Sequence, residues 1–167
     1  MPTEYVYFES PLGTIRISET ASCISEVSFI QADTSAQPDL QEPHNVSEVL
    51  KKCVQKLTNY FNGDISSFDL PLELDGTPFQ KRVWSCLCHI PYGKRLSYAE
   101  LSKQLGDPKA IRAVGTANSK NKIAIIVPCH RVIGSNGSLV GYAGELWRKK
   151  WLLEHEGKHA HGVQKLF

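Results

Sequence analysis

An uninterrupted apolar run, Ile123 to Val127, constrains the fold of this chain more than any other segment. The run is rich in β-branched residues, which favour strands, and a short apolar run of this kind is typical of a buried strand. Pro128 follows it and cannot donate a hydrogen bond to a neighbouring strand. We therefore predict a buried strand over residues 123–127 that ends at Pro128.

Three polar or reactive residues, Cys129, His130 and Arg131, come directly after this predicted strand. A thiol beside an imidazole and a guanidinium lies where a thiolate would be stabilised. Cys129 is therefore a candidate nucleophile. The alternative is a buried, unreactive cysteine, which is how most free cysteines behave. The two polar neighbours favour the nucleophile.

The composition is that of a globular chain with one or two small domains: 167 residues, 41% of them hydrophobic. No apolar stretch is long enough to span a bilayer, and no secretory signal is visible at the start, so we expect no membrane partner. Five cysteines, an odd number, indicate reduced thiols. We expect an intracellular protein, cytoplasmic in a prokaryote and nuclear in a eukaryote.

A metal site is the other chemistry that cysteines can indicate. Cys86, Cys88 and His89 lie close together, but their spacing matches no standard zinc pattern. The sequence also shows no cofactor motif. We predict neither a metal nor a cofactor.

Charge is divided unequally along the chain. Residues 1–75 hold 4 Lys or Arg against 12 Asp or Glu, a net −8, whereas residues 76–167 hold 15 against 5, a net +10. The basic half could bind a polyanion such as DNA. Alternatively, two surfaces of opposite sign could attract each other across a domain interface. The charges alone favour neither explanation.

The pattern of apolar residues predicts two domains, residues 1–75 and 76–167, with a boundary at Asp75-Gly76. The first has alternating, strand-like segments over 5–8, 14–18 and 24–30, a loop over 31–45 and a helical pattern over 46–61. The second becomes helical from Thr77. The fold class is thus mixed α/β, with a small antiparallel sheet in the N-terminal domain and a mostly helical C-terminal domain.

Two short helices joined by a tight turn are predicted after residue 96. Ser97 and Glu100 have the spacing of a capping box, and Gly106-Asp107-Pro108 turns the chain, with Pro108 in the first turn of the second helix. This arrangement resembles a helix-turn-helix, whose second helix binds DNA. Its buried face is predicted at Ala110, Ala113, Val114 and Ala117, and another face at Lys109, Arg112 and Thr116. The small residues could allow a close approach to DNA or merely tight packing between helices.

The residues Pro128 to Ile133 resemble the active-site signature of the methylated-DNA–protein-cysteine methyltransferases, also called 6-O-alkylguanine-DNA alkyltransferases. The similarity extends over about 78–157 and is thinner in the N-terminal half, where it rests on Ser10-Pro11-Leu12-Gly13. Further matches are Phe79-Gln80, Ile90 to Gly93, Ser97-Tyr98, Ala113 to Gly115, Asn118, Asn121, Gly141-Tyr142 and Trp151 to Glu156.

This resemblance implies a C-terminal domain with a winged helix-turn-helix, and a monomer that binds double-stranded DNA containing 6-O-alkylguanine. It implies that the damaged base is flipped out and that its alkyl group moves once and irreversibly to Cys129. It gives catalytic roles to Cys129, His130, Glu156, Tyr98 and Asn121, with a water between Cys129 and His130. It implies substrate binding by Val140, Gly141, Tyr142, Ala143, Gly144 and Lys149, and DNA binding by Ser97, Lys109, Arg112, Ala113, Gly115 and Thr116. Arg131 is expected to tie the active-site loop to the N-terminal domain.

Three alternative functions are compatible with parts of this pattern. A non-catalytic alkyltransferase-like protein lacks the acceptor cysteine, and Cys129 is present. A sequence-specific regulator would show a large preference for one DNA site over random DNA. A cysteine hydrolase using Cys129, His130 and Glu156 would turn over many times and has no use for Arg112.

Overall fold

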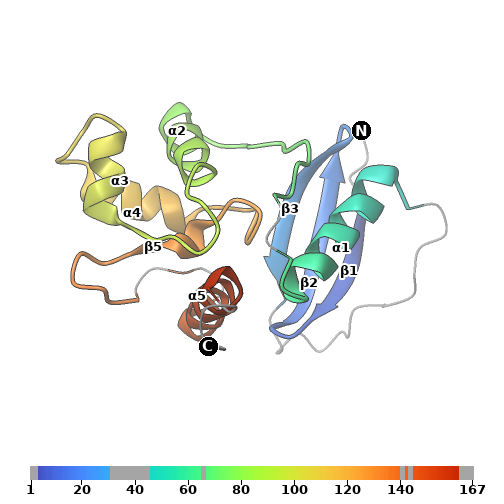
Figure 1. Ribbon diagram of the computed structural model, residues 1–167. Coiled ribbons are helices and arrows are strands. Elements are labelled where there is room, and N and C mark those ends of the chain that lie inside the picture. Colours follow the sequence, from blue (N-terminus) through green and yellow to red (C-terminus); the bar gives the residue numbers. More distant parts are fainter. Residues whose placement is uncertain (1–3, 31–45, 65–66, 140–141, 143–144, 162–167) are drawn as a thin grey trace. The chain divides into compact units, whose positions relative to one another are not determined.

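The alternating segments at the start of the chain form a three-stranded antiparallel sheet (Figure 1). The computed structural model describes residues 4–30, 46–64, 67–139, 142 and 145–161, and the chain divides into two units, residues 1–73 and 74–167. In the first unit β1 (Glu4–Ser10), β2 (Gly13–Thr20) and β3 (Cys23–Phe29) follow one another in the sheet. A shift in the pairing of β2 with β3 places Ile24 and Val27, three residues apart, both in the core.

One helix, α1 (Glu48–Phe61), covers a face of this sheet (Figure 1). The Ser47 side chain caps its first turn by accepting a hydrogen bond from the Leu50 amide. The apolar spacing seen in the sequence becomes its buried stripe, which includes Leu50, Cys53 and Leu57. Each such side chain contributes about 1.5–3 kcal/mol when fully buried. This hydrophobic face holds the sheet and helix together as one unit.

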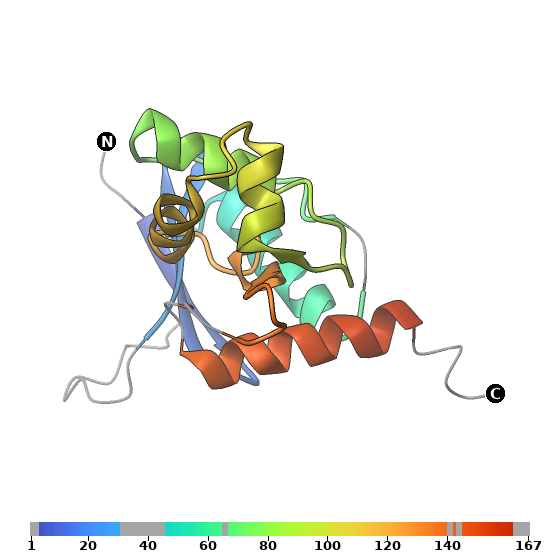
Figure 2. The same ribbon diagram turned by 90° about the vertical axis from the view of Figure 1, so that its left-hand side faces the viewer.

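The second unit is mostly helical, so the predicted mixed α/β class is confirmed. Its elements are α2 (Pro78–Leu87), β4 (Leu96–Ser97), α3 (Tyr98–Gln104), α4 (Ile111–Ser119), the 3-10 turn η1 (Cys129–Arg131), β5 (Val132–Ile133) and α5 (Leu146–His161). Figure 2 shows α5 as one long helix. No helix among the described residues combines the length and apolar character that a membrane span requires.

Capping boxes begin both α2 and α3. At α3 the Ser97 hydroxyl accepts from the Glu100 amide at 3.0 Å, and the Ser97 amide donates to the Glu100 carboxylate at 3.2 Å, as predicted. Thr77 and Gln80 form the same pair at α2, with Pro78 in the first turn. These reciprocal bonds satisfy amides that the helix itself leaves unpaired.

The helix α4 differs from its prediction in two respects. It begins at Ile111, and Pro108 lies in the preceding turn, where the Ala110 amide donates to the Asp107 carbonyl. Its buried side is formed by Val114, Ala117 and Asn118, whereas Ala113 is exposed. The buried stripe therefore includes Asn118 and excludes Ala113. α3 and α4 still lie against each other as a helix-turn-helix pair does (Figure 2).

The predicted strand over residues 123–127 is wrong, because this run is a buried turn. The Val127 amide donates to the Ile123 carbonyl, and Ile125 has a positive φ of 71°. A left-handed conformation costs a β-branched residue about 1–2 kcal/mol. The side chain of Asn121 offsets this cost, since its amide donates to the carbonyls of Ile123 at 3.3 Å and Val127 at 2.9 Å. A single polar side chain thus replaces the strand partner that the run would otherwise need.

We expect Thr77→Ala to lower the free energy of unfolding by about 1 kcal/mol, because the variant loses the cap of α2. Urea unfolding monitored by circular dichroism measures the change. Ser85→Ala is the matched control, since Ser85 is exposed within the same helix and its side chain caps nothing. Equal stability of Thr77→Ala and the parent would show that the capping box contributes little.

Candidate active site

The Cys129 thiol lies in a tight turn inside the C-terminal unit, with only 5% of the residue exposed. The Cys129 amide donates to the Val127 carbonyl at 2.7 Å, and the side chain of Asn118 donates to the Cys129 carbonyl at 3.2 Å. β5 leaves this turn and pairs in parallel with β4, Val132 opposite Leu96. The backbone on both sides of the sulfur is therefore fixed by hydrogen bonds.

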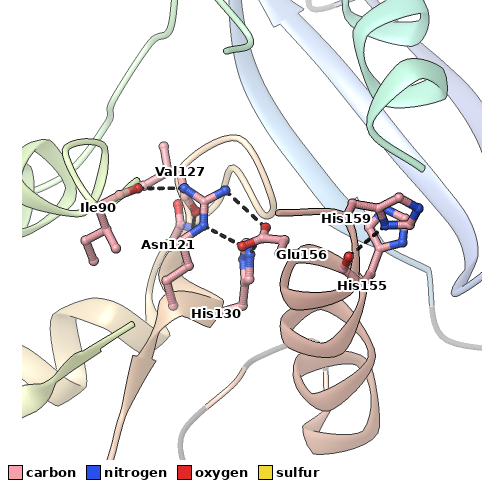
Figure 3. A network of polar contacts seen from close by, with 8 residues as sticks. Ile90, Asn121, Val127, His130, His155, Glu156 and His159 are labelled. Carbon is pink, nitrogen blue, oxygen red and sulfur yellow. Dashed lines mark hydrogen bonds and ion pairs between the residues drawn. The ribbon is translucent and has the colours of Figure 1, made fainter. Parts of the chain in front are cut away.

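A buried cluster of three charged or polar side chains lies next to this turn. His130 Nε2 and Glu156 Oε2 are 2.6 Å apart, and Figure 3 shows Glu156 on α5 facing the His130 ring. Arg131 donates to both oxygens of the same carboxylate, at 2.8 and 3.0 Å, and to the Ile90 carbonyl at 2.7 Å. His130 and Glu156 are at most 1% exposed. One carboxylate thus joins the turn to α5.

Glu156 is ionised in this cluster. Burial alone would raise the pKa of Glu156, but the hydrogen bonds from His130 and Arg131, together with the positive charge of Arg131, outweigh burial and lower the pKa well below its usual value. A bidentate guanidinium is the strongest partner that a buried carboxylate can have. The pair of Arg131 and Glu156 therefore carries no net charge.

His130 is neutral for the same reason. Burial lowers the pKa of His130, and this effect outweighs the attraction of Glu156, which Arg131 already neutralises. A neutral ring bonded to a carboxylate through Nε2 keeps its hydrogen there. Nδ1 then has a free lone pair, and it has no hydrogen-bond partner among the described residues. The ring is thus a base with its accepting atom available.

The thiol of Cys129 is protonated at rest, because burial raises its pKa. The hydrogen bond of Asn121 and the charge of Lys149 oppose this effect. Lys149 is itself fully buried, and burial lowers its pKa to about 8 while Cys129 acts in the opposite direction. A thiolate formed here would therefore meet a cation and a hydrogen-bond donor within the site.

Two tyrosines complete the surroundings of the sulfur. Burial raises the pKa of both Tyr98 and Tyr142, and the Cys129 thiolate would raise them further. The Lys149 ammonium is 5.8 Å from the centre of the Tyr98 ring. Both phenols thus remain protonated at neutral pH and can donate hydrogen bonds.

The structure brings together six of the residues predicted for catalysis or substrate binding: Cys129, His130, Glu156, Tyr98, Asn121 and the lysine at 149. Tyr142 also lies near them, since the charge of a Cys129 thiolate would raise the pKa of Tyr142. Val140, Gly141, Ala143 and Gly144 lie outside the described residues.

The residues predicted to bind DNA are mostly exposed, whereas the thiol is buried. Lys109, Arg112, Ala113 and Thr116 are exposed in α4 and in the turn before it, whereas Ser97 is buried at the start of α3 and Gly115 is half-buried in α4. Within the described part of the chain, no group of three or more metal-binding side chains is present.

Sequence reasoning missed two features of the site. Arg131 was expected to reach the N-terminal domain, but its described hydrogen bonds go to Glu156 and Ile90 in its own unit. Asn118 was given no role, although it is 1% exposed and contacts the Cys129 backbone. A signal for Asn118 existed, since a polar residue on the apolar stripe of a helix needs a buried partner.

Comparison with known proteins places both units in one family. Residues 4–74 match the 6-O-methylguanine DNA methyltransferase ribonuclease-like domain, and residues 78–158 match the DNA binding domain of the same name. The chain is 46% identical to a methylated-DNA–protein-cysteine methyltransferase of Methanosarcina acetivorans over 92% of its length and 97% of the relative's. A protein of the same name from Mycolicibacterium paratuberculosis is 40% identical, over 98% of each chain. The crystal structure of Mycobacterium tuberculosis OGT in complex with DNA superposes with a TM-score of 0.80 at 40% identity, covering 93% of each chain.

We expect the free energy of unfolding to fall as the pH is lowered from neutral. The folded-state pKa of His130 lies below its ordinary 6.5 and that of Glu156 below its ordinary 4.5, so the unfolded chain binds more protons. The stabilising effect of His130 is therefore lost first, from about pH 6.5 downwards, and that of Glu156 below about pH 4.5. Urea unfolding at a series of pH values measures this.

The contribution of His130 can be isolated with His130→Gln, which should have a weaker pH dependence between about pH 7.5 and 5.5. His89→Gln, at an exposed histidine of the same unit, is the matched control and should follow the parent. Parallel curves for His130→Gln and the parent would contradict a neutral, buried imidazole.

Proposed function

This chain belongs to the 6-O-methylguanine DNA methyltransferase family and repairs DNA by alkyl transfer to one of its own cysteines; we propose that the acceptor is Cys129. The observation that supports this assignment is the combination of a buried thiol with a neutral imidazole base, His130, and a cation, Lys149. The other cysteines lack this combination of neighbours. Cys53, for example, lies on the buried face of α1, where burial raises its pKa to about 12.

DNA binding is proposed for the exposed side of α4 and the turn before it. Arg112 and Lys109 are exposed cations there, and the half of the chain that contains them carries a net +10. Such cations bind phosphates and displace the counterions of DNA. Ala113 has a small side chain on this exposed side, and Gly115 adds none at its border with Tyr98, so the helix is narrow there, which suits the minor groove. Ser97, at the start of α3, and Thr116 would add contacts at the edge.

The lesion must leave the helix before it can react. The 6-O atom lies within the base stack, so a buried sulfur cannot approach its alkyl carbon in line. We propose that the damaged guanine is flipped out and that Arg112 enters the space it leaves. Tyr142, with Val140, Gly141, Ala143, Gly144 and Lys149, would then form the pocket around the base.

Activation of the thiol is proposed to run through His130. A bridging water at Nδ1 would pass the Cys129 proton to the ring, and Glu156 would stabilise the imidazolium that forms. Asn121 and Lys149 would stabilise the thiolate meanwhile. Arg131 keeps Glu156 ionised throughout, so that the carboxylate is available when the ring becomes charged.

Transfer itself exchanges one bond for another. The sulfur–carbon bond forms, the carbon–oxygen bond breaks, and the electron pair passes to the guanine, which takes a proton from Tyr98. The thioether product has no acidic proton and is a poor leaving group, so the thiol is not regenerated. One protein monomer would therefore repair one lesion.

Intact-mass measurement after incubation with methylated duplex DNA tests the acceptor. We expect an increase of about 14 Da, the replacement of one hydrogen by a methyl group, since the covalent adduct does not resolve. Peptide mapping should place it on Cys129, and a tenfold excess of lesions should add no second methyl.

Cys129→Ser should gain no mass, whereas Cys88→Ser, at an exposed cysteine of the same unit, should behave as the parent. Repair by Cys129→Ser, or more than one methyl per chain, would refute the proposal. Many turnovers on an ester or peptide would instead indicate a hydrolase.

Arg112→Ala should slow transfer from duplex DNA by at least tenfold, because the flipped state loses the side chain that fills the stack. Transfer from the free methylated base should change little, since flipping is not needed there. Lys52→Ala, which removes an exposed cation of α1, is the control. An equal loss on both substrates would show that Arg112 serves the fold or the chemistry instead.

A further inference from the structure

The side chain of Asn118 is buried on the inner side of α4, beside Val114 and Ala117, with 1% of the residue exposed. An amide in such a place costs about 1–3 kcal/mol unless it is hydrogen-bonded. Its two neighbours on the stripe are apolar, so packing alone would favour an apolar residue there. The hydrogen-bond partners of the Asn118 side chain therefore indicate why a polar residue lies at this position.

Those partners belong to two elements of the proposed site. Asn118 Nδ2 donates to the Cys129 carbonyl at 3.2 Å, and the side chain also forms a hydrogen bond with the Tyr98 hydroxyl, which partly opposes the rise that burial causes in the pKa of that phenol. Its Oδ1 atom has no partner among the described residues. Asn118 thus acts as a hydrogen-bond donor through its Nδ2 group. In this way it links the turn that carries Cys129 to the Tyr98 hydroxyl.

The Tyr98 ring is placed so that this link is possible. A Cβ atom added at Gly115 would lie 3.8 Å from the ring, so the ring packs on α4 at that residue. Asn118 follows Gly115 by three residues and lies on the same side of the helix, near the hydroxyl end. The helix therefore supports the whole phenol, first by contact and then by a hydrogen bond.

We propose that Asn118 is a positioning residue for alkyl transfer, which holds the Tyr98 hydroxyl and the Cys129 turn in one fixed arrangement. A donor bonded to the phenol oxygen occupies one of its lone pairs and does not use the hydroxyl hydrogen, which the phenol can donate to the flipped base. The second bond, to the Cys129 carbonyl, keeps the sulfur in register with that hydrogen. This inference rests on the proposed function.

The proton balance of the step shows why the arrangement matters. As the sulfur–carbon bond forms and the carbon–oxygen bond breaks, the leaving guanine receives the Tyr98 proton. The phenolate is then reprotonated by the proton that left the thiol for His130. Donation by Asn118 stabilises the phenolate between these two events.

Single-turnover kinetics with methylated duplex DNA test the role of Asn118. Asn118→Ala should lower the limiting transfer rate at saturating DNA about tenfold, the effect of one lost buried hydrogen bond, and leave the dissociation constant for DNA unchanged. In a Tyr98→Phe background the same substitution should have almost no further effect, because Asn118 acts through the missing hydroxyl.

Asn118→Asp retains the size of the side chain but cannot donate, so it should be as slow as Asn118→Ala. Ser119→Ala, at the next residue of α4, should match the parent. The inference would be overturned by a normal rate in Asn118→Ala, by full additivity with Tyr98→Phe, or by a loss confined to DNA affinity. Absence of transfer by the parent itself would instead refute the proposed function.

Discussion

The ionised carboxylate of Glu156, buried between Arg131 and His130, is the interaction on which the rest of the C-terminal unit depends. It joins α5 to the turn that carries the thiol, and through Arg131 it reaches the Ile90 carbonyl after α2. Removing one partner of a buried ion pair costs about 3–5 kcal/mol, because the other charge is left uncompensated. The folded protein therefore requires all three members of the cluster. The pairing of Arg131 with Glu156 also leaves His130 neutral, as a catalytic base must be.

The two cations of the site, Arg131 and Lys149, have different electrostatic roles because they contact different partners. Arg131 satisfies the carboxylate, so that His130 is left uncharged, while Lys149 acts on the sulfur and lies over the Tyr98 ring. The two cations thus act on different groups: Arg131 on the carboxylate and the imidazole, and Lys149 on the thiol. This division explains why a signature with adjacent histidine and arginine does not simply produce a permanently ionised cysteine.

The sequence correctly predicted the elements that depend on local residue patterns. It did not predict the features that depend on a hydrogen bond from a side chain outside the pattern. The alternation in β1 to β3, the stripe of α1 and the capping box at Ser97 are local, and each appears in the structure. The run from Ile123 to Val127 has the composition of a strand, but Asn121 bonds its carbonyls and turns it. The partner of Arg131 lies 25 residues away, and no spacing rule reveals it. Of the site, the family signature supplied the residues, whereas their charge states required the packing.

The two-residue ladder between β4 and β5 restricts how the length of this chain can vary. β4 leads directly into α3, and β5 follows directly from the turn of Cys129, so Leu96 opposite Val132 sets the start of α3 against the sulfur. An insertion within either strand would displace one relative to the other. The exposed turn at 135–138 does not set the position of either strand, because it is closed locally by a hydrogen bond from the Gly134 amide to the Ser138 carbonyl. Evolutionary gain or loss of residues should therefore concentrate in this turn, which follows the ladder in the chain and leaves its pairing unchanged.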